Sequence, residues 1–193
     1  MKLIKAILML IGLVVVVGMG FVYSKLDSAA LPTYGKMFGT VVSTGDAAKG
    51  MVIKRKLVIE EGTTKEEAIE SALEIMDEIG EQYGLAMVDT KLMSKGEKDA
   101  NGVYQPYIRI RSYCSKTIAQ KFLAYSPEFI GFMPCRIGIV EDPKTHDVYL
   151  YTMAMDLMIS GGATLPDELL ELATEVKTGM YSMLEKAASG EED

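Results

Sequence analysis

The sequence contains few of the side chains from which catalytic and metal sites are usually built. Its 193 residues include no tryptophan, one histidine and two cysteines. The chain therefore cannot assemble a site of four His and Cys ligands, and a Ser-His-Asp or Cys-His site would have to use His146. It also has no P-loop and no G-x-G-x-x-G, H-E-x-x-H, G-x-S-x-G or C-x-x-C motif. These absences favour a binding or accessory role over an enzyme and indicate no particular cofactor.

Positive charge is also scarce. The chain carries 20 Lys and Arg against 27 Asp and Glu, a net charge of −7, with a pI near 4.9. Binding to nucleic acid needs a basic surface that neutralises phosphates, so we expect no nucleic-acid partner. Hydrophobic residues make up 49% of the chain and charged residues 24%, which is typical of a folded domain. The length allows one ordinary domain and an anchor.

One long hydrophobic run lies near the N-terminus. Residues 6–23 contain no charge and would form a helix of about 27 Å, close to the thickness of the hydrocarbon core. With Leu3 and Ile4, residues 3–23 are expected to cross the membrane, within an anchor at 1–25. The alternative is a signal peptide cleaved near the small residues 28–30. The run is longer than the 7–15 apolar residues or so of a signal peptide, which favours the anchor.

The flanks of this run predict its orientation. Lys2 and Lys5 precede it, whereas Lys25 beyond it is followed by Asp27, so the N-terminus is expected in the cytoplasm. The rest of the chain would then be periplasmic or otherwise extracytoplasmic, attached to the inner (cytoplasmic) membrane by a single pass. Residues 26–193 have a net charge of −10, which would hold the domain away from an anionic lipid surface.

The exported part divides into three stretches. Residues 26–50 are rich in small residues and broken by Pro and Gly, so no amphipathic period persists, which predicts a linker. Residues 51–187 are expected to form the domain, and 188–193 an acidic tail. Within the domain the pattern predicts an α+β order of elements. These are a strand at 51–60, a helix at 64–83, strands at 85–94 and 103–113, a short helix at 115–125, strands at 136–140 and 148–153, and a helix at 167–187.

Two local patterns support these elements. Thr64 and Glu67 have the spacing of a capping box at the start of the first long helix. Ile108 and Ile110 alternate with Arg109 and Arg111, which predicts a strand with the isoleucines toward the core and the arginines toward water. The simplest packing is an antiparallel sheet with the two long helices on one face.

A string of residues between 113 and 153 resembles the family called domain of unknown function 302 (DUF302), and the resemblance covers about 51–187. The matching positions are Tyr113–Ser115, Ala119, Leu123, Pro127, Pro134–Glu141, Val148–Leu150 and Met153. The resemblance implies a β-α-β(4)-α fold of the TATA-binding-protein-like class, with an inserted short helix. It also implies a homodimer, because homodimers occur in the family, but it implies no activity.

The two cysteines are the leading candidates for a ligand or redox site. Cys114 ends one expected strand and Cys135 begins the next, and in an exported compartment a disulfide between them is the first interpretation. Two buried unreactive thiols are the second. The third is a reactive pair whose thiol pKa is lowered by the N-terminus of the 115–125 helix, Lys116 and Arg136, able to exchange thiols, carry sulfur or bind a soft metal.

Methionine and histidine offer weaker candidates. Met153, Met155 and Met158 cluster near the C-terminal end of a strand and would suit Cu(I), but Met occurs along the whole chain and a Met-rich core explains the cluster better. We therefore take Cys114, Cys135, Arg136 and Met153 as candidate ligand or redox residues. His146 lies in a polar turn and is expected to be a solvated loop residue. The hypotheses are a binding or accessory domain, a thiol-dependent redox, sulfur or soft-metal carrier, or a subunit of a larger membrane complex.

Overall fold

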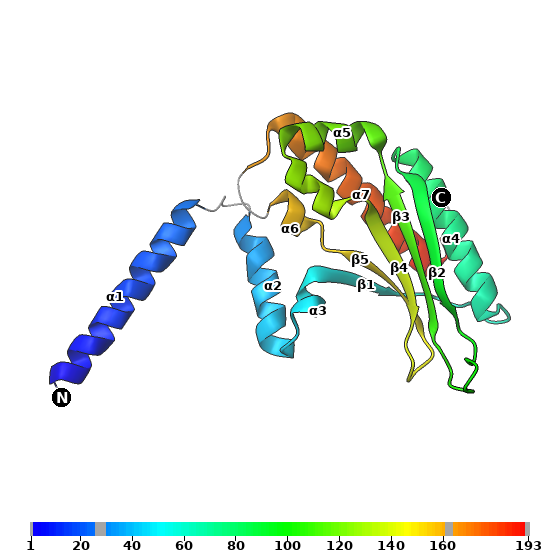
Figure 1. Cartoon of the computed structure of the whole chain (residues 1–193), viewed down its shortest axis with the longest axis horizontal. Helices are drawn as coiled ribbons and strands as arrows, with labels where there is room; N and C mark the ends of the chain where they lie inside the picture. Colours follow the sequence, from blue (N-terminus) through cyan, green and yellow to red (C-terminus); the bar gives the residue numbers. More distant parts are fainter. Residues whose placement is uncertain (1, 26–29, 161–163, 192–193) are drawn as a thin grey trace. The chain divides into compact units, whose positions relative to one another are not determined.

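The computed structural model describes residues 2–25, 30–160 and 164–191. The chain divides into two compact units (Figure 1), one formed by Met1–Gly50 with Asp156–Leu165 and the other by Met51–Met155 with Pro166–Asp193. The expected cleavage site at 28–30 falls largely outside the described residues, as does the end of the expected acidic tail.

The first unit contains one helix that is long and apolar enough to cross a membrane. Helix α1 spans Lys2–Lys25, and its segment Ile4–Phe21 has a mean hydropathy of 2.5 and is not buried by other parts of the chain. Length and composition thus agree with the expected anchor. The other elements of this unit are the helices α2 (Ala30–Thr44), α3 (Ala47–Met51) and α6 (Asp156–Ile159), and α2 contacts α6.

The stretch expected to be an irregular linker is helical in α2 and α3. Tyr34, Met37 and Val41 recur at helical spacing and are half-buried, so α2 has one apolar side. The expectation that no amphipathic period persists here is therefore wrong, because these three residues keep their helical spacing although glycines lie between them. The role of the stretch as a linker stays a prediction.

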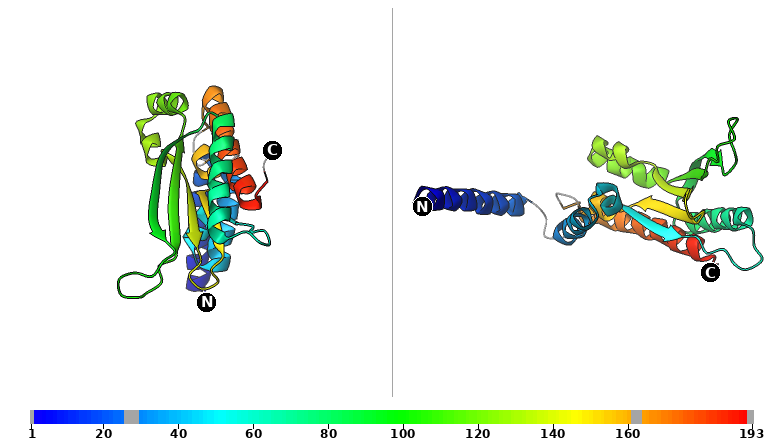
Figure 2. Two further views of the ribbon diagram at one scale, coloured as in Figure 1. Left: turned by 90° about the vertical axis from the view of Figure 1, so that its right-hand side faces the viewer. Right: turned by 90° about the horizontal axis from the view of Figure 1, so that it is seen from below.

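The second unit is a five-stranded antiparallel sheet with two long helices on one face (Figure 2). The helices are α4 (Lys65–Gln82) and α7 (Asp167–Ser189), and a short helix α5 (Lys116–Tyr125) and a 3-10 helix η1 (Pro127–Phe132) are inserted between the third and fourth strands. This confirms the expected α+β architecture. In the order β1-β5-β4-β3-β2, the strands are β1 (Val52–Lys56), β5 (Val148–Met153), β4 (Cys135–Glu141), β3 (Tyr107–Cys114) and β2 (Ala86–Lys95).

Local signals and close packing fix the two long helices. The Thr64 hydroxyl accepts a hydrogen bond from the Glu67 backbone N–H, and the Glu67 carboxylate accepts one from Thr64 N–H at 2.8 Å, which confirms the capping box. Helices α4 and α7 pack against each other where Gly179 meets Tyr83. The core lies between these helices and the sheet; its fully buried residues include Leu73, Met76, Ile137, Ile139, Leu150, Met180 and Met183.

The two faces of β3 are opposite to the expectation. Arg109 forms an ion pair with Glu70 of α4 at 3.3 Å, and Arg111 pairs with Asp77 of the same helix, so the arginines lie on the helix side. The isoleucines therefore lie on the other side of the sheet. Alternation alone does not say which side faces the core, and an arginine stem can lie along apolar surface while its head reaches a carboxylate.

We call the side of the sheet away from α4 and α7 the open face. In the strand register, Ile110 lies beside Gly138 and Gly138 beside Tyr151. These residues are half-buried, whereas the alternating Ile137, Ile139 and Leu150 are fully buried. The centre of the open face is formed by Ile108, Ile110, Gly138, Val140, Tyr149 and Tyr151, and the strand register places the charged residues Lys91 of β2 and Lys54 of β1 beside them.

Candidate functional site

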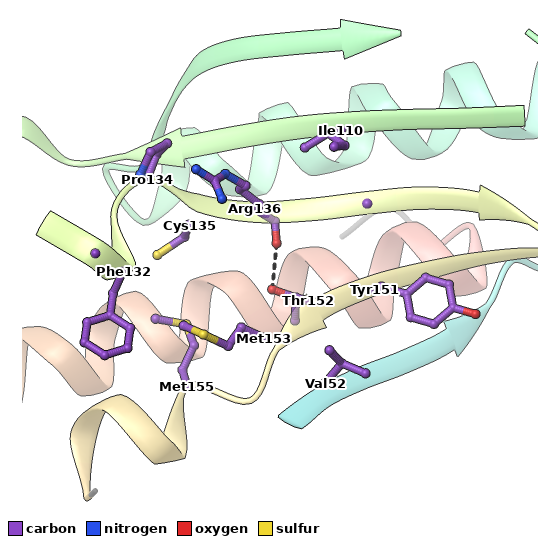
Figure 3. Close-up of a pocket in the computed structure, with 12 residues that line it drawn as sticks. Val52, Ile110, Phe132, Pro134, Cys135, Arg136, Tyr151, Thr152, Met153 and Met155 are labelled. Atoms are coloured by element: carbon purple, nitrogen blue, oxygen red, sulfur yellow. Dashed lines mark hydrogen bonds between the residues drawn. The ribbon is translucent and has the colours of Figure 1, made fainter. Parts of the chain in front are cut away.

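A hollow of about 280 Å³ lies at one end of the open face, where β4 begins (Figure 3). Strands β1, β3, β4 and β5 contribute to it, together with the segment after α5. Three of the four residues singled out from the sequence line it, namely Cys135, Arg136 and Met153, whereas Cys114 does not. The other lining residues are Val52, Ile110, Gly131, Phe132, Pro134, Gly138, Tyr151, Thr152 and Met155.

The expected disulfide is not formed, because Cys114 and Cys135 are both free thiols in the structure. Cys135 lies opposite Tyr113 in the β3–β4 register. Since successive side chains of a strand point to opposite faces, Cys135 shares a face with Tyr113, and Cys114 starts from the other one. The thiols are nevertheless close enough for Cys114 to influence the ionisation of Cys135.

Both thiols are harder to ionise than an ordinary cysteine. Burial, and secondarily the neighbouring Cys114, raises the pKa of Cys135 to about 11. Burial also raises the pKa of Cys114. The expectation of a lowered thiol pKa is therefore wrong, because burial removes the hydration that stabilises a thiolate. Near neutral pH, Cys135 is protonated and a weak nucleophile.

The hollow brings sulfur atoms together from two strand ends. Figure 3 shows the Cys135 thiol at the start of β4 pointing toward the side chains of Met153, the last residue of β5, and of Met155, two residues after it. Met155 is 2% exposed, and its backbone N–H donates a hydrogen bond to the Tyr181 hydroxyl of α7 at 2.9 Å. Met158, the third methionine of the cluster, lies in α6 and does not line the hollow.

One positive charge borders this site. Arg136 is exposed, and its guanidinium forms no ion pair with any residue that the structure describes. Its backbone carbonyl accepts a hydrogen bond from the Thr152 hydroxyl at 2.9 Å, which joins β4 to β5 beside the hollow. With Phe132 and Tyr151 on its walls, the hollow combines an apolar lining, soft sulfur donors and one cation.

A second cluster surrounds Glu141, which the sequence analysis did not single out. Its carboxylate is completely buried and accepts hydrogen bonds from the Tyr104 hydroxyl at 2.8 Å and Tyr107 N–H at 2.9 Å. Lys65 Nζ lies 3.2 Å away and His146 Nδ1 2.8 Å away. Burial acts to raise the pKa of Glu141, but these hydrogen bonds outweigh it and hold the pKa at about 2. The cluster joins β3, β4, α4 and two loops.

The sequence did contain a signal for this cluster. Ile137, Ile139 and Glu141 alternate along one strand, and the first two are buried, so the third occupies a buried position as well. His146 is 60% exposed, which agrees with a loop residue, but its ring nitrogen is fixed on Glu141 and its backbone has φ +60°. His146 is therefore a loop residue, as expected, but its ring is held by the buried Glu141 carboxylate.

Comparison with known proteins shows the family and the fold. The family model described as "Domain of unknown function DUF302" matches residues 61–187. A crystal structure of an uncharacterized conserved protein DUF302 from Bacillus stearothermophilus is similar, with a TM-score of 0.52 and 12% sequence identity, over 71% of this chain and 98% of that one. No curated protein matches the chain.

Proposed function

Because the chain belongs to the DUF302 family, a family of unknown function, we propose its role from the geometry of the hollow: it is a membrane-anchored domain that binds a small ligand there. The observation that carries the proposal is the meeting of Cys135, Arg136 and Met153 in one hollow. A small concave site with an apolar lining and a few polar or soft groups is typical of ligand binding.

We propose that this domain lies on the extracytoplasmic side of the inner membrane. Support comes from the apolar helix α1 and from Lys2 and Lys5 before it, against Lys25 followed by Asp27 beyond it. A protease added to sealed right-side-out and inside-out membrane vesicles would test this. The domain should be digested only in the right-side-out vesicles, whose extracytoplasmic face is outside.

A thiol-dependent redox enzyme or sulfur carrier is a weaker alternative. Such chemistry needs a thiolate near neutral pH, and burial raises the pKa of both Cys114 and Cys135. Among the described residues, no basic side chain is hydrogen-bonded to either thiol. The same protonated thiols are compatible with ligand binding.

Filling the hollow tests the proposed function. A Cβ on Gly138 would meet no atom within 4 Å, so Gly138→Leu should fill the hollow without forcing the backbone to move. Full-length protein extracted in mild detergent from its own membrane would be examined by native mass spectrometry. We expect a non-covalent mass adduct on the wild type that is absent from Gly138→Leu.

The control is Val140→Leu, which enlarges a residue of the same face outside the hollow. We expect this variant to keep the adduct. Absence of any adduct from the wild type, or an equal adduct on Gly138→Leu, would contradict the proposed function.

We also propose that the domain associates with a second copy of itself. The support is the apolar centre of the open face, formed in part by Ile108, Ile110 and Val140. Light scattering of the detergent-extracted chain should give the mass of two copies. A larger hetero-complex would favour the accessory-subunit alternative instead, and a monomer would contradict both.

A further inference from the structure

We propose that the hollow binds Cu(I) through the sulfur atoms of Cys135, Met153 and Met155. This inference rests on the proposed function, because it names the class of ligand that the same hollow holds. It uses the chemistry of the lining residues, which include three sulfur donors and no carboxylate or imidazole.

The donors select a soft ion. Thiolate and thioether sulfur bind Cu(I) well, whereas Mg²⁺, Ca²⁺ and Mn²⁺ prefer carboxylate and carbonyl oxygen. No Asp, Glu or His lines the hollow, and the described residues contain no group of three or more His, Cys, Asp and Glu that could hold a metal. Zinc, which is usually held by four Cys, His or carboxylate ligands, therefore lacks its ligand set.

The placement of the sulfurs supports a shared ligand. All three side chains line one hollow where β4 begins and β5 ends (Figure 3). In the strand register Cys135 starts on the helix side of the sheet and Met153 on the open face, so they enter the hollow from the two sides of the strand ends, and Met155 follows two residues after Met153. Two of these positions are held firmly, since Met155 is bonded through its backbone to Tyr181 and β4 is tied to β5 by Thr152.

Charge also favours a monovalent ion. One Cu(I) with one thiolate and two thioethers is a neutral complex, and a neutral complex suits a buried site where an isolated charge is costly. A divalent ion in the same set would leave one uncompensated positive charge beside the guanidinium of Arg136, which has no carboxylate partner among the described residues. That repulsion disfavours the dication.

The binding step involves no change of oxidation state. The Cys135 S–H bond breaks, its proton passes to solvent, and the sulfur electron pair forms a bond to Cu(I), while each methionine donates a lone pair. Metal binding is able to deprotonate a thiol of high pKa because the metal competes with the proton for the same electron pair.

A competition titration tests the inference. Full-length protein in detergent, reduced and kept without oxygen, would be titrated with Cu(I) against a chromophoric Cu(I) chelator. We expect one Cu(I) per chain. Met153→Leu and Met155→Leu each remove a sulfur at nearly constant volume, and each should weaken the affinity by about tenfold or more, by analogy with the lower end of the loss seen for residues that support metal ligands.

Cys135→Ser should abolish tight binding. The matched control is Met183→Leu, which removes the sulfur of a fully buried methionine that does not line the hollow, and it should bind Cu(I) as the wild type does. Circular dichroism would check each variant for folding. Met153 is only half-buried, so Met153→Leu is expected to stay folded. This variant therefore still tests the inference if Met155→Leu proves unstable.

The outcomes separate this inference from the proposed function. Unchanged Cu(I) affinity in Cys135→Ser and both hollow methionine variants, or no binding by the wild type, would overturn the copper assignment. If an organic adduct that depends on Gly138 were present at the same time, the hollow would still be a binding site, for another class of ligand.

Discussion

Cys135 lies directly opposite Tyr113 in the ladder between β3 and β4, and the Tyr113 hydroxyl donates a hydrogen bond to Asp77 of α4 at 2.8 Å. Cys135, which lines the hollow, is thus paired with Tyr113, and the Tyr113 side chain is hydrogen-bonded to helix α4. The pairing also places Cys114 one position further along β3. The position of the candidate site is therefore determined by the register of the sheet.

The two thiols should react slowly and unequally. With a pKa of about 11, only about one Cys135 in ten thousand is a thiolate at neutral pH, and the thiolate is the form that reacts. We predict slow labelling of native protein by iodoacetamide, with Cys114 modified before Cys135 and a steep rise in the Cys135 rate toward alkaline pH. Peptide mass spectrometry would measure both rates. Label that enters only after reduction would instead reveal a disulfide.

Removal of the charge on Glu141 should destabilise the domain. Glu141→Gln keeps the shape of the side chain, but it weakens the charged hydrogen bonds from Lys65 and His146 and sets an amide N–H against other donors. We predict a loss of about 3 kcal/mol in the free energy of unfolding. Urea denaturation would measure it. Glu74→Gln, an exposed substitution on α4, should change stability by less than about 0.5 kcal/mol.

The same residue predicts a dependence on pH. The folded pKa of Glu141, about 2, lies below its ordinary value of 4.5, so its contribution to stability is present above pH 4.5 and is lost as the pH falls through about 2. The stability difference between wild type and Glu141→Gln should therefore shrink across this window. Paired urea titrations at several pH values would show it. A difference that stayed constant down to the lower pH would contradict the assigned role.

Close contact between the two long helices predicts the effect of Gly179→Ala. The added Cβ would lie 2.8 Å from both Cβ and Cγ of Tyr83, which directly follows α4, and this distance is so short that neighbouring atoms must shift. Overpacking of this kind costs about 1–3 kcal/mol, more than the gain of about 1 kcal/mol in helix propensity. Thermal denaturation should show a lower midpoint for Gly179→Ala. Gly131→Ala, whose Cβ meets nothing within 4 Å, should leave the midpoint nearly unchanged.

The long helices could be predicted because their signals are local. The capping box at Thr64 and Glu67 and the apolar stripe of α7 require no knowledge of the rest of the fold. The face of β3 could not be predicted in the same way. Whether Ile110 or Arg111 faces the core depends on where Asp77 of α4 lies, and that is a tertiary relationship.

The candidate site was predicted in its members but not in its chemistry. Cys135, Arg136 and Met153 were identified by residue type, and the sheet does place them on one hollow. The raised pKa of Cys135 depends on burial, which its neighbours in sequence do not reveal. Met155 joins the site because β4 and β5 are adjacent strands, whereas Met158 belongs to the other unit of the chain.

Nuclear magnetic resonance of the methionine methyl groups tests most directly that the domain binds its ligand in this hollow. The full-length chain would carry ¹³C-methyl label on its 14 methionines, with signals assigned by Met→Leu variants. On addition of one equivalent of Cu(I), the account predicts that the signals of Met153 and Met155 shift while those of Met180 and Met183 stay in place. Unmoved signals from Met153 and Met155, with shifts elsewhere in the chain, would contradict it.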